Sequence, residues 1–385
     1  MNFQGSIRSK LPGVGTTIFT VMSAMAREHE AINLSQGFPD FNPDALLQNE
    51  VEKAIRSGNN QYAPMAGLPI LRERIAAKVE SLYKVTVDPE SEITITAGGT
   101  QALCTAIASL ISENDEVILF SPAYDSYSPS VELAGGKAIH YSMEAPDFAI
   151  NWQQVKKLVT QRTRMIVINT PHNPTGTILS DKDMKELEKL TKATDIIILS
   201  DEVYEHIVFD GAAHQSVLRY PKLAERSIVV GSFGKTYHAT GWKVGYCIAP
   251  KELTTEFRKV HQFNVFSVST PMQYAYAEIL KHSHLYENLS AFYQEKRDFF
   301  KNAMKGSKFD LLDTKGTYFQ LASYKKITED KDTDVVKWLT KEFKVAAIPV
   351  SVFYHQHLDQ KVIRFCFAKE NETLERAAEN LSKIN

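Results

Sequence analysis

The segment SFGKTYHATGWKVGY, residues 232–246, decides how the chain is interpreted. It follows RSIVVGS, an apolar run that ends on small residues and predicts a buried strand. The loop after such a strand can hold Lys235 inside a cleft, where partial desolvation lowers the pKa of its amine. An amine of this kind is a nucleophile that forms Schiff bases with carbonyl compounds. Lys243 adds a second positive charge eight residues later.

Taken alone, Lys235 would be interpreted as an ordinary surface residue. The chain holds 44 lysines and arginines, and nearly all such side chains are solvated. An isolated motif match is also weak. The segments that surround this one therefore decide whether the lysine is functional.

Short apolar strands alternate with helices between residues 92 and 249. The predicted strands are EITITAGG, EVILF, KAIHY, RMIVINT, DIIILSD, RSIVVGS and KVGYCIA. This rhythm predicts a mostly parallel sheet covered by helices on both faces, with ligands bound at the carboxyl ends of the strands. The residues that follow such ends, and are expected to converge there, are Gly98 to Gln101, Tyr124, Asn173, Asp201, Tyr204 and Lys235.

The segments outside this region indicate a second unit. Residues 16–29 predict an amphipathic helix and residues 270–306 a long helical region, while GTYFQLA, VAAIPV and KVIRFCFA predict strands. We therefore expect an α/β fold of two parts. The large domain, with a mostly parallel sheet sandwiched by helices, is assigned to 34–280. The smaller α+β domain is assigned to 1–33 and 281–385.

Composition narrows the class of protein. The chain has 385 residues, of which 43% are hydrophobic and 23% charged, which is typical of a soluble globular protein. A net charge of -2 gives no reason to expect nucleic acid or an acidic membrane as partner. Cys104, Cys247 and Cys366 lie far apart in apolar contexts, so we expect buried thiols without a disulfide or a metal site. We find no secretory signal and no apolar run of about 18 residues, so a cytoplasmic location is expected.

Two upstream segments offer groups that suit a bound heterocycle. In PHNPTG, Asn173 stands between prolines, whose fixed backbone makes a rigid loop that can aim an amide. Asp201 follows the apolar run IIILS, and a buried acid there is costly unless it is paired, for instance with a cationic ring nitrogen. Tyr204 would lie on the same side if Asp201 opens a helical turn. The plainer interpretations are a proline-rich turn and a helix N-cap.

Taken together, these segments resemble the class I/II aminotransferases, the fold-type I pyridoxal phosphate enzymes. The motifs occur in the order of that family and span nearly the whole chain: QGFPDF, GGTQAL, PHNPTG, SDEVY, SFGKTYHATGWKVGY and RFCF. Six separate motifs in the right order make the resemblance specific. The sequences QGFPDF, SFGKT and ATGWKVGY are similar to the motifs typical of the methionine and kynurenine–glutamine aminotransferase branch.

The resemblance implies a role for each residue around the cofactor, pyridoxal 5'-phosphate. Lys235 would attach it covalently and, once released by substrate, would carry a proton as general base and then acid. Asp201 would keep the pyridine nitrogen protonated, so that the ring acts as an electron sink. Asn173 and Tyr204 would hydrogen-bond its phenolic oxygen, and Tyr124 would stack on its face.

The resemblance also implies a phosphate site at the start of the helix that Gly99, Thr100 and Gln101 open. The unpaired N–H groups of a helix N-terminus favour an anion. Ser232 and Lys243 would complete this site. Many class I members carry arginine where this chain has Lys243, and a lysine supplies charge without a two-pronged fork.

The remaining implied roles concern the substrate and a second subunit. Tyr62 would reach the phosphate of the neighbouring subunit, which makes each active site a product of a homodimer. Arg364 would bind the substrate α-carboxylate as a two-pronged pair, and Gly37 would add a backbone N–H. Phe266 is assigned to an apolar side-chain pocket, with plain core packing as the alternative. Ser267 stands where some relatives have histidine, which weakens the case for aromatic oxo acids.

The implied reaction moves the amino group of an L-amino acid to a 2-oxo acid in two half-reactions. Methionine and then aromatic amino acids are the expected donors, and aspartate is disfavoured because no second arginine is evident for a dicarboxylate. Alternatives on the same fold are kynurenine–oxoglutarate aminotransfer, β-elimination of cysteine S-conjugates and a ring-forming lyase reaction. A cofactor-binding regulator is disfavoured because the segment before QGFPDF is short and not basic. A nicotinamide dehydrogenase is disfavoured because the first strand lacks G-x-G-x-x-G. The donor, the acceptor, the pathway and any assembly beyond a dimer stay open.

Overall fold

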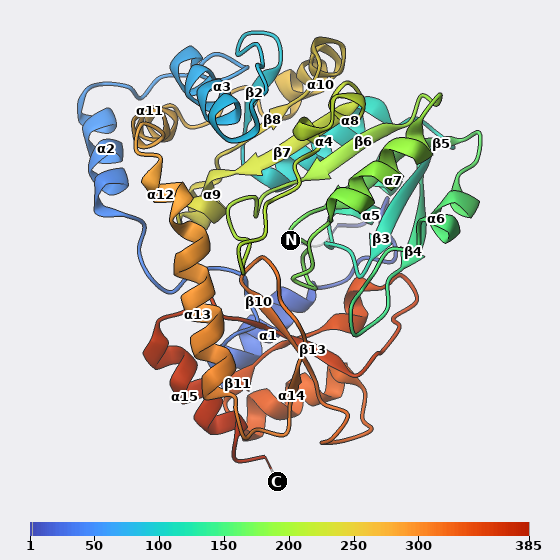
Figure 1. The fold of residues 1–385 in the computed structure, drawn as a ribbon, viewed down its shortest axis with the longest axis vertical. Coiled ribbons are helices and arrows are strands. Elements are labelled where there is room, and N and C mark those ends of the chain that lie inside the picture. Colours follow the sequence, from blue (N-terminus) through green and yellow to red (C-terminus); the bar gives the residue numbers. More distant parts are fainter. Residues whose placement is uncertain (2, 385) are drawn as a thin grey trace.

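A seven-stranded sheet forms the centre of the larger half of the molecule in the computed structural model, which describes residues 1 and 3–384 (Figure 1). The strand order is β2-β8-β7-β6-β5-β3-β4. Neighbours pair in parallel except at β8, which is antiparallel to β2 and β7. The prediction of a mostly parallel sheet is therefore confirmed. The strands are β2 (Ile93–Thr96), β3 (Glu116–Ser121), β4 (Lys137–Ser142), β5 (Thr163–Asn169), β6 (Ile197–Asp201), β7 (Ser227–Ser232) and β8 (Gly245–Ile248).

Helices cover both faces of this sheet, and the central strands carry apolar side chains on both faces for that reason. Along β5, Met165 and Val167 join the core on one face, while Ile166 and Ile168 join the core on the other. The first face is covered by α4 (Gly99–Leu110), α5 (Tyr127–Leu133) and α10 (Lys251–Asn264). The second is covered by α2 (Ala45–Arg56), α3 (Pro69–Tyr83), α6 (Trp152–Leu158), α7 (Asp181–Thr191) and α11 (Thr270–Ile279).

The smaller half has its own hydrophobic core around a four-stranded antiparallel sheet, β12-β13-β10-β9. Met22 and Ala26 of the N-terminal helix α1 (Ile18–Glu28) belong to this core, as expected from the amphipathic pattern of residues 16–29. A short parallel pair, β1 with β11, lies beside it. The remaining elements here are β1 (Ile32–Asn33), α13 (Leu289–Ala303), β9 (Asp310–Leu311), β10 (Phe319–Ser323), α14 (Asp332–Glu342), β11 (Val345–Ala346), β12 (Ile348–Pro349), η3 (Val350–Phe353), β13 (Val362–Cys366) and α15 (Asn371–Leu381).

The helical region predicted over 270–306 is interrupted. It consists of α11, a single turn α12 (His284–Glu287) and α13, which runs from the larger half into the smaller (Figure 1). The polar stretch from Lys281 to Ser283 separates the apolar faces of α11 and α13, so one continuous helix could not bury both. Short elements complete the fold: η1 (Val217–Arg219), α8 (Pro221–Ala224), α9 (Phe233–Thr236) and η2 (Thr240–Trp242).

The three cysteines are free thiols. Cys247 and Cys366 are buried as expected, whereas Cys104 on α4 is only half-buried, with its Sγ 3.1 Å from Ser130 Oγ. Within the described part of the chain, no helix combines the length and the apolarity that a membrane span needs.

Candidate functional site

A cavity of about 310 Å³ lies at the carboxyl ends of the central strands and is closed by residues of the smaller half. Eleven of the fourteen residues assigned from the sequence line it: Gly37, Gly99, Thr100, Tyr124, Asn173, Asp201, Tyr204, Ser232, Lys235, Lys243 and Arg364. Strand order explains this convergence, since the ends of β5, β6 and β7 lie side by side in the sheet. Gln101, Tyr62 and Phe266 do not line it.

Lys235 sits on the one-turn helix α9, directly after β7. Its Nζ donates to the hydroxyl oxygen of Tyr318 at 3.0 Å and to the carbonyl oxygen of Gly37 at 3.2 Å. Burial lowers the pKa of Lys235 to about 8. A fraction of the amine is therefore uncharged near neutral pH, which a nucleophile or base requires.

Asp201 is the last residue of β6 and is 4% exposed. Its Oδ2 accepts from the Tyr127 hydroxyl at 2.6 Å, and its Oδ1 accepts from the Val203 N–H at 3.3 Å. Burial raises the pKa of Asp201 to about 6, since no cation offsets the desolvation fully. The plainer interpretation as a helix N-cap is wrong, because hydrogen-bonded turns follow β6 instead of a helix.

Replacement of Asp201 by asparagine is expected to stabilise the cofactor-free protein at neutral pH. The folded state holds a proton on Asp201 that the unfolded state loses between about pH 4 and pH 6. The stability of the wild type therefore falls as pH rises through that window, by up to about 3 kcal/mol, and Asp201→Asn removes the fall. Thermal unfolding midpoints from pH 4 to pH 8 measure this. Parallel curves for the two proteins would contradict it.

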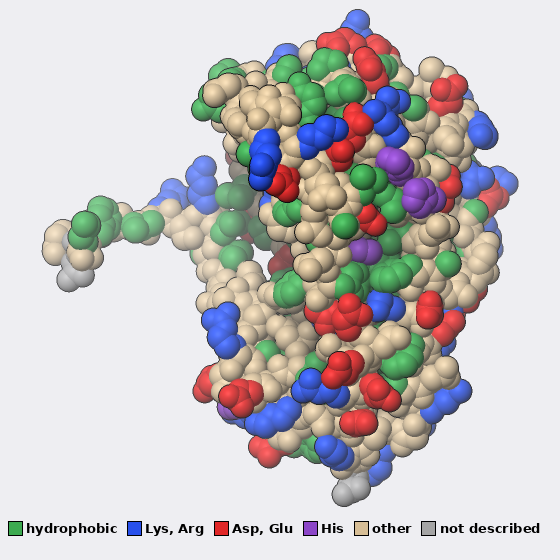
Figure 2. Space-filling view, turned by 90° about the vertical axis from the view of Figure 1, so that its left-hand side faces the viewer, with side chains coloured by type: hydrophobic (Ala, Val, Ile, Leu, Met, Phe, Trp, Pro, Cys, Tyr) green, Lys and Arg blue, Asp and Glu red, His purple; other side chains and the backbone are tan. Residues whose placement is uncertain are grey.

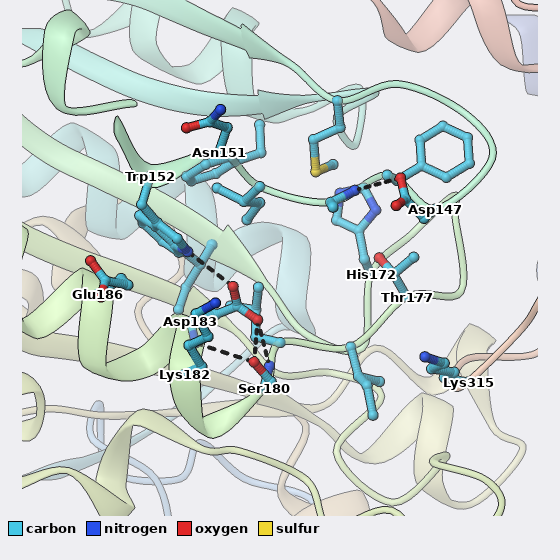
Figure 3. A pocket seen from close by; sticks show the side chains of 18 of the residues that line it. Asp147, Asn151, Trp152, His172, Thr177, Ser180, Lys182, Asp183, Glu186 and Lys315 are labelled. Carbon is cyan, nitrogen blue, oxygen red and sulfur yellow. Dashed lines mark hydrogen bonds between the residues drawn. The ribbon is translucent and has the colours of Figure 1, made fainter. Parts of the chain in front are cut away.

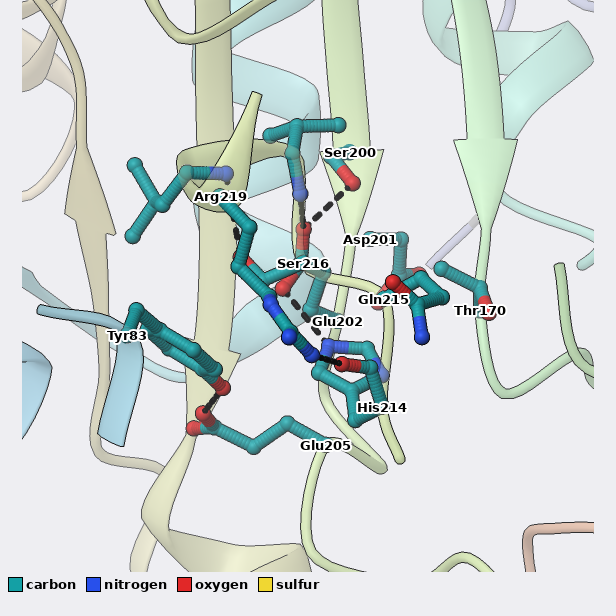
Figure 4. Close-up of polar contacts among 12 residues, drawn as sticks. Tyr83, Thr170, Ser200, Asp201, Glu202, Glu205, His214, Gln215, Ser216 and Arg219 are labelled. Atoms are coloured by element: carbon teal, nitrogen blue, oxygen red, sulfur yellow. Dashed lines mark hydrogen bonds and ion pairs between the residues drawn. The ribbon is translucent and has the colours of Figure 1, made fainter. Parts of the chain in front are cut away.

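Tyr204 is buried three residues after Asp201, and its ring meets that of Tyr318 edge to face with centroids 5.2 Å apart. Two buried glutamates, Glu202 and Glu205, fix the turn that carries both Asp201 and Tyr204 (Figure 4). Glu202 accepts from Ser200 Oγ at 2.8 Å, and its other oxygen lies 2.8 Å from His214 Nε2. These contacts hold the turn that presents Asp201 to the cavity.

The start of α4 forms one wall of the cavity. Gly98 precedes it with a φ of +83°, a conformation that glycine adopts without strain. The first intrahelical bond runs from Ala102 N to Gly98 O, so the N–H groups of Gly99, Thr100 and Gln101 precede it. Only the backbone of Gln101 is free for a ligand, since its side-chain amide contacts Ala97 N, Thr105 Oγ1 and His261 Nδ1.

Positive charge and hydroxyl groups surround this helix start. A Cβ placed on Gly98 would lie 3.5 Å from Lys243 Nζ, so the Lys243 amine is beside the helix terminus. Thr100 Oγ1 lies 3.1 Å from the Tyr124 hydroxyl, and Ser232 lines the same side. This arrangement suits a phosphate group.

Arg364 on β13 is 1% exposed and stacks over the Phe319 ring, with its Cζ 3.9 Å from the ring centroid. Its Nη1 donates to Asn173 Oδ1 at 2.8 Å and its Nη2 to the Ser35 carbonyl at 2.9 Å. Its Nε is buried and has no hydrogen-bond partner among the described residues. A buried guanidinium with a free donor and only neutral partners favours a bound anion.

Among the residues that the sequence did not indicate, three hold groups of the site in place. Tyr127 supports Asp201, and Tyr318 contacts Lys235. Asn169, at the end of β5, donates from Nδ2 to the Asp201 carbonyl at 2.9 Å and accepts from the Asn173 N–H at 2.7 Å. Their only sequence signal was a position close to a strand end.

Tyr62 and Phe266 lie together on the surface instead of in the cavity. They are 80% and 46% exposed, with ring centroids 5.1 Å apart. The N-terminal segment projects from the body of the molecule and exposes Phe3 and Ile7 (Figure 2). Exposed aromatic and aliphatic residues of this size are typical of surfaces that another chain covers.

A larger hollow of about 950 Å³ lies elsewhere, beside α6 and the start of α7 (Figure 3). Two of its polar groups are hydrogen-bonded to protein side chains: Trp152 Nε1 donates to Asp183 Oδ1 at 2.9 Å, and His172 Nδ1 lies 2.7 Å from Thr175 Oγ1. Burial lowers the pKa of His172 to about 3. Because neither Lys235 nor Arg364 lines it, this hollow is not the candidate site.

A lysine with a lowered pKa, a buried acid and a buried arginine around one cavity of an α/β fold suit an enzyme that uses an amine to act on a small carboxylate. The chain belongs to the class I and II aminotransferase family, whose model matches residues 29–381, and it transfers amino groups. It is 48% identical to the methionine aminotransferase of Escherichia coli K12 over 378 residues, 98% of each chain. It is 33% identical to human kynurenine–oxoglutarate transaminase 1, over 97% of each chain. The crystal structure of YbdL from Escherichia coli, described with a methionine aminotransferase function, matches with a TM-score of 0.96 at 48% identity, over 98% of this chain and 99% of that one.

Proposed function

We propose that this aminotransferase uses pyridoxal 5'-phosphate and prefers methionine as amino donor, with aromatic amino acids next. The observation that carries the proposal is one cavity in which Lys235, Asp201 and Arg364 meet the start of α4. The relatives named for methionine and kynurenine support this choice of donors.

The residues present fit the proposed cofactor. The free N–H groups of α4, with Ser232 and Lys243, would hold its phosphate. Asp201, whose buried carboxylate lacks a cation, would pair with its protonated ring nitrogen. Asn173 and Tyr204 would contact its phenolic oxygen and Tyr124 its ring face. When bound, the cofactor supplies an electron sink for negative charge that develops at the substrate Cα.

The chain's own residues would bind substrate and move the proton. Arg364 would bind the α-carboxylate through its free Nε and an Nη group, and the Gly37 N–H would add a hydrogen bond. This fixes Cα near the Lys235 amine. With a pKa of about 8, that amine can take the Cα proton as a base and return it as an acid.

We extend the proposal to a cytoplasmic homodimer with shared active sites. Tyr62 and Phe266 lie outside the cavity of their own chain and are exposed, so they are available to complete the cavity of a second copy. In that arrangement Tyr62 would reach the partner's phosphate site and Phe266 its side-chain pocket. We also propose that residues 34–280 form the large domain, and 1–33 with 281–385 the small one.

The test is a panel of amino donors and 2-oxo acids with the purified protein supplied with pyridoxal phosphate. We expect kcat/KM for methionine to exceed that for aspartate by at least tenfold, because one unpaired carboxylate in an apolar pocket costs on the order of 1.4 kcal/mol or more. Kynurenine as the best donor, or pyruvate and thiol from cysteine S-conjugates as the main products, would favour the alternatives. A colourless protein that takes up no pyridoxal phosphate would overturn the assignment of the cofactor.

A further inference from the structure

Tyr318, just before β10, joins the Lys235 amine to the loop that carries Gly37. Its side chain is 0% exposed. Its hydroxyl donates to the Gly37 carbonyl at 2.7 Å and accepts from Lys235 Nζ at 3.0 Å. Lys235 Nζ also donates to the same carbonyl at 3.2 Å. The three groups therefore share a set of hydrogen bonds beside the cavity, and the Tyr204 hydroxyl is a further polar neighbour of Tyr318.

The proton inventory of this set fixes its direction. The Tyr318 hydroxyl has a single proton, which it donates to the Gly37 carbonyl, and with that proton in use its oxygen accepts from Lys235. Burial raises the pKa of Tyr318 well above its usual value, which keeps that proton in place. A neutral amine has two N–H bonds and one lone pair. If both N–H bonds are taken by Tyr318 and Gly37, the lone pair must point away from them.

Packing holds both acceptors in place. The Tyr318 ring lies against Tyr204 and Tyr293, with centroids 5.2 and 5.6 Å away. A Cβ on Gly37 would lie 2.6 Å from Phe319 Cζ and 3.3 Å from Tyr318 Cε2, so only glycine allows the loop to come this close. The two oxygens that receive the amine are therefore fixed relative to α9.

We propose that Tyr318 is a positioning residue, which, together with the Gly37 carbonyl, holds both N–H bonds of the neutral Lys235 amine and turns its lone pair toward the cavity. This rests on the proposed function in so far as Lys235 is the nucleophile and base. A lone pair that points into the cavity is needed both when the amine attacks a carbonyl carbon and when it takes a proton from the substrate Cα.

The test compares Tyr318→Phe, which keeps the ring and removes the hydroxyl, with the wild type. In the cofactor-free protein, the rate of Lys235 acylation by acetic anhydride is followed against pH by mass spectrometry. The Tyr318 oxygen accepts a hydrogen bond that favours the ammonium form of Lys235. Its loss in Tyr318→Phe is therefore expected to lower the pKa of Lys235 and with it the midpoint of the acylation profile. In the holoenzyme we expect kcat to fall about 10- to 100-fold with little change in KM, as for loss of a hydrogen bond to a charged group. The isotope effect from a Cα-deuterated donor should rise.

Tyr293→Phe is the matched control. Tyr293 is equally buried and touches Tyr318, but its hydroxyl has no hydrogen-bond partner among the described residues. Its profile and isotope effect should equal those of the wild type. The proposal is overturned if Tyr318→Phe matches the wild type in both readouts, or if Tyr293→Phe shifts them equally.

Gly37→Ala is a second variant in case Tyr318→Phe does not fold. It moves the loop carbonyl away from Lys235, and it should also lower the acylation midpoint; an unchanged midpoint counts against the proposal. The acylation readout needs no cofactor. If the wild type binds no pyridoxal phosphate, the proposed function is contradicted. The acylation profile still tests whether Tyr318 positions the Lys235 amine.

Discussion

Lys235→Ala is expected to lower the rate of amino transfer by about 10²- to 10⁴-fold or more, the loss typical for removal of a general acid–base group. The variant should also lose the absorbance band of a cofactor held through a protonated imine. Borohydride reduction of the loaded wild type should leave the cofactor on the peptide that contains residue 235, and reduction of the variant should leave it on none. We expect this because Lys235 lines the cavity and burial lowers the pKa of its amine to about 8.

Lys243→Ala provides a control within the same cavity. Lys243 also lines the cavity, but its side chain lies against Gly98 at the start of α4. This variant should keep the absorbance band and the reducible link, and it should bind pyridoxal phosphate more weakly because one charge at the phosphate site is gone. A link at residue 243 in the wild type, or full activity of Lys235→Ala, would contradict the assignment.

The parts of the fold that depend on local pattern could be predicted from the sequence. The runs of β5 and β6 are apolar on both faces because helices cover both, and that is visible in RMIVINT and DIIILSD without coordinates. Seven of the eleven cavity residues could be placed for the same reason, since the carboxyl ends of parallel strands share an edge. The other four, Gly37, Ser232, Lys243 and Arg364, were assigned through the family resemblance.

The remaining features depend on distances that no local pattern encodes. Tyr318 is 83 positions from Lys235, and Tyr127 is 74 positions from Asp201, so neither hydrogen bond could be expected from spacing. The contact between the Gln101 side chain and His261 of α10 could not be expected from the sequence either, while the backbone N–H of Gln101 remains a predicted donor to the phosphate. Tyr62 and Phe266 remain predictions, because their proposed roles require a second chain.

A buried ion pair behind the cavity gives the largest expected effect on stability. Glu205 and Lys78 are both less than 10% exposed, and Lys78 Nζ lies 2.5 Å from Glu205 Oε1. Tyr246 and Tyr83 each donate to Glu205 at 2.6 Å, so the carboxylate joins α3 and β8 to the turn that carries Asp201 and Tyr204 (Figure 4 shows the Tyr83 contact). Both carboxylate oxygens of Glu205 are therefore hydrogen-bonded.

The charge state of Glu205 follows from these partners. Burial alone raises the pKa of Glu205, but Lys78, His206 and the hydrogen bonds lower it more, so the net pKa is well below its usual value. An acid with a depressed folded pKa contributes stability that is present above its unfolded value of about 4.3 and is lost as pH falls through the folded value. The pair therefore stabilises the fold at neutral pH and weakens only in strong acid.

Glu205→Gln is expected to destabilise the protein by about 3 to 5 kcal/mol at pH 7, because it leaves the Lys78 ammonium buried without a counter-charge. Thermal unfolding, at fixed protein and cofactor concentrations, measures the loss. Glu256→Gln is the matched control: its pair with Lys259 at 2.7 Å is exposed, so its loss should stay within about 1 kcal/mol. Combining Lys78→Met with Glu205→Leu removes both charges and should recover most of the stability. If that double variant is as unstable as Glu205→Gln, an uncompensated charge is not the cause, and the hydrogen bonds from Tyr83 and Tyr246 must hold the turn instead.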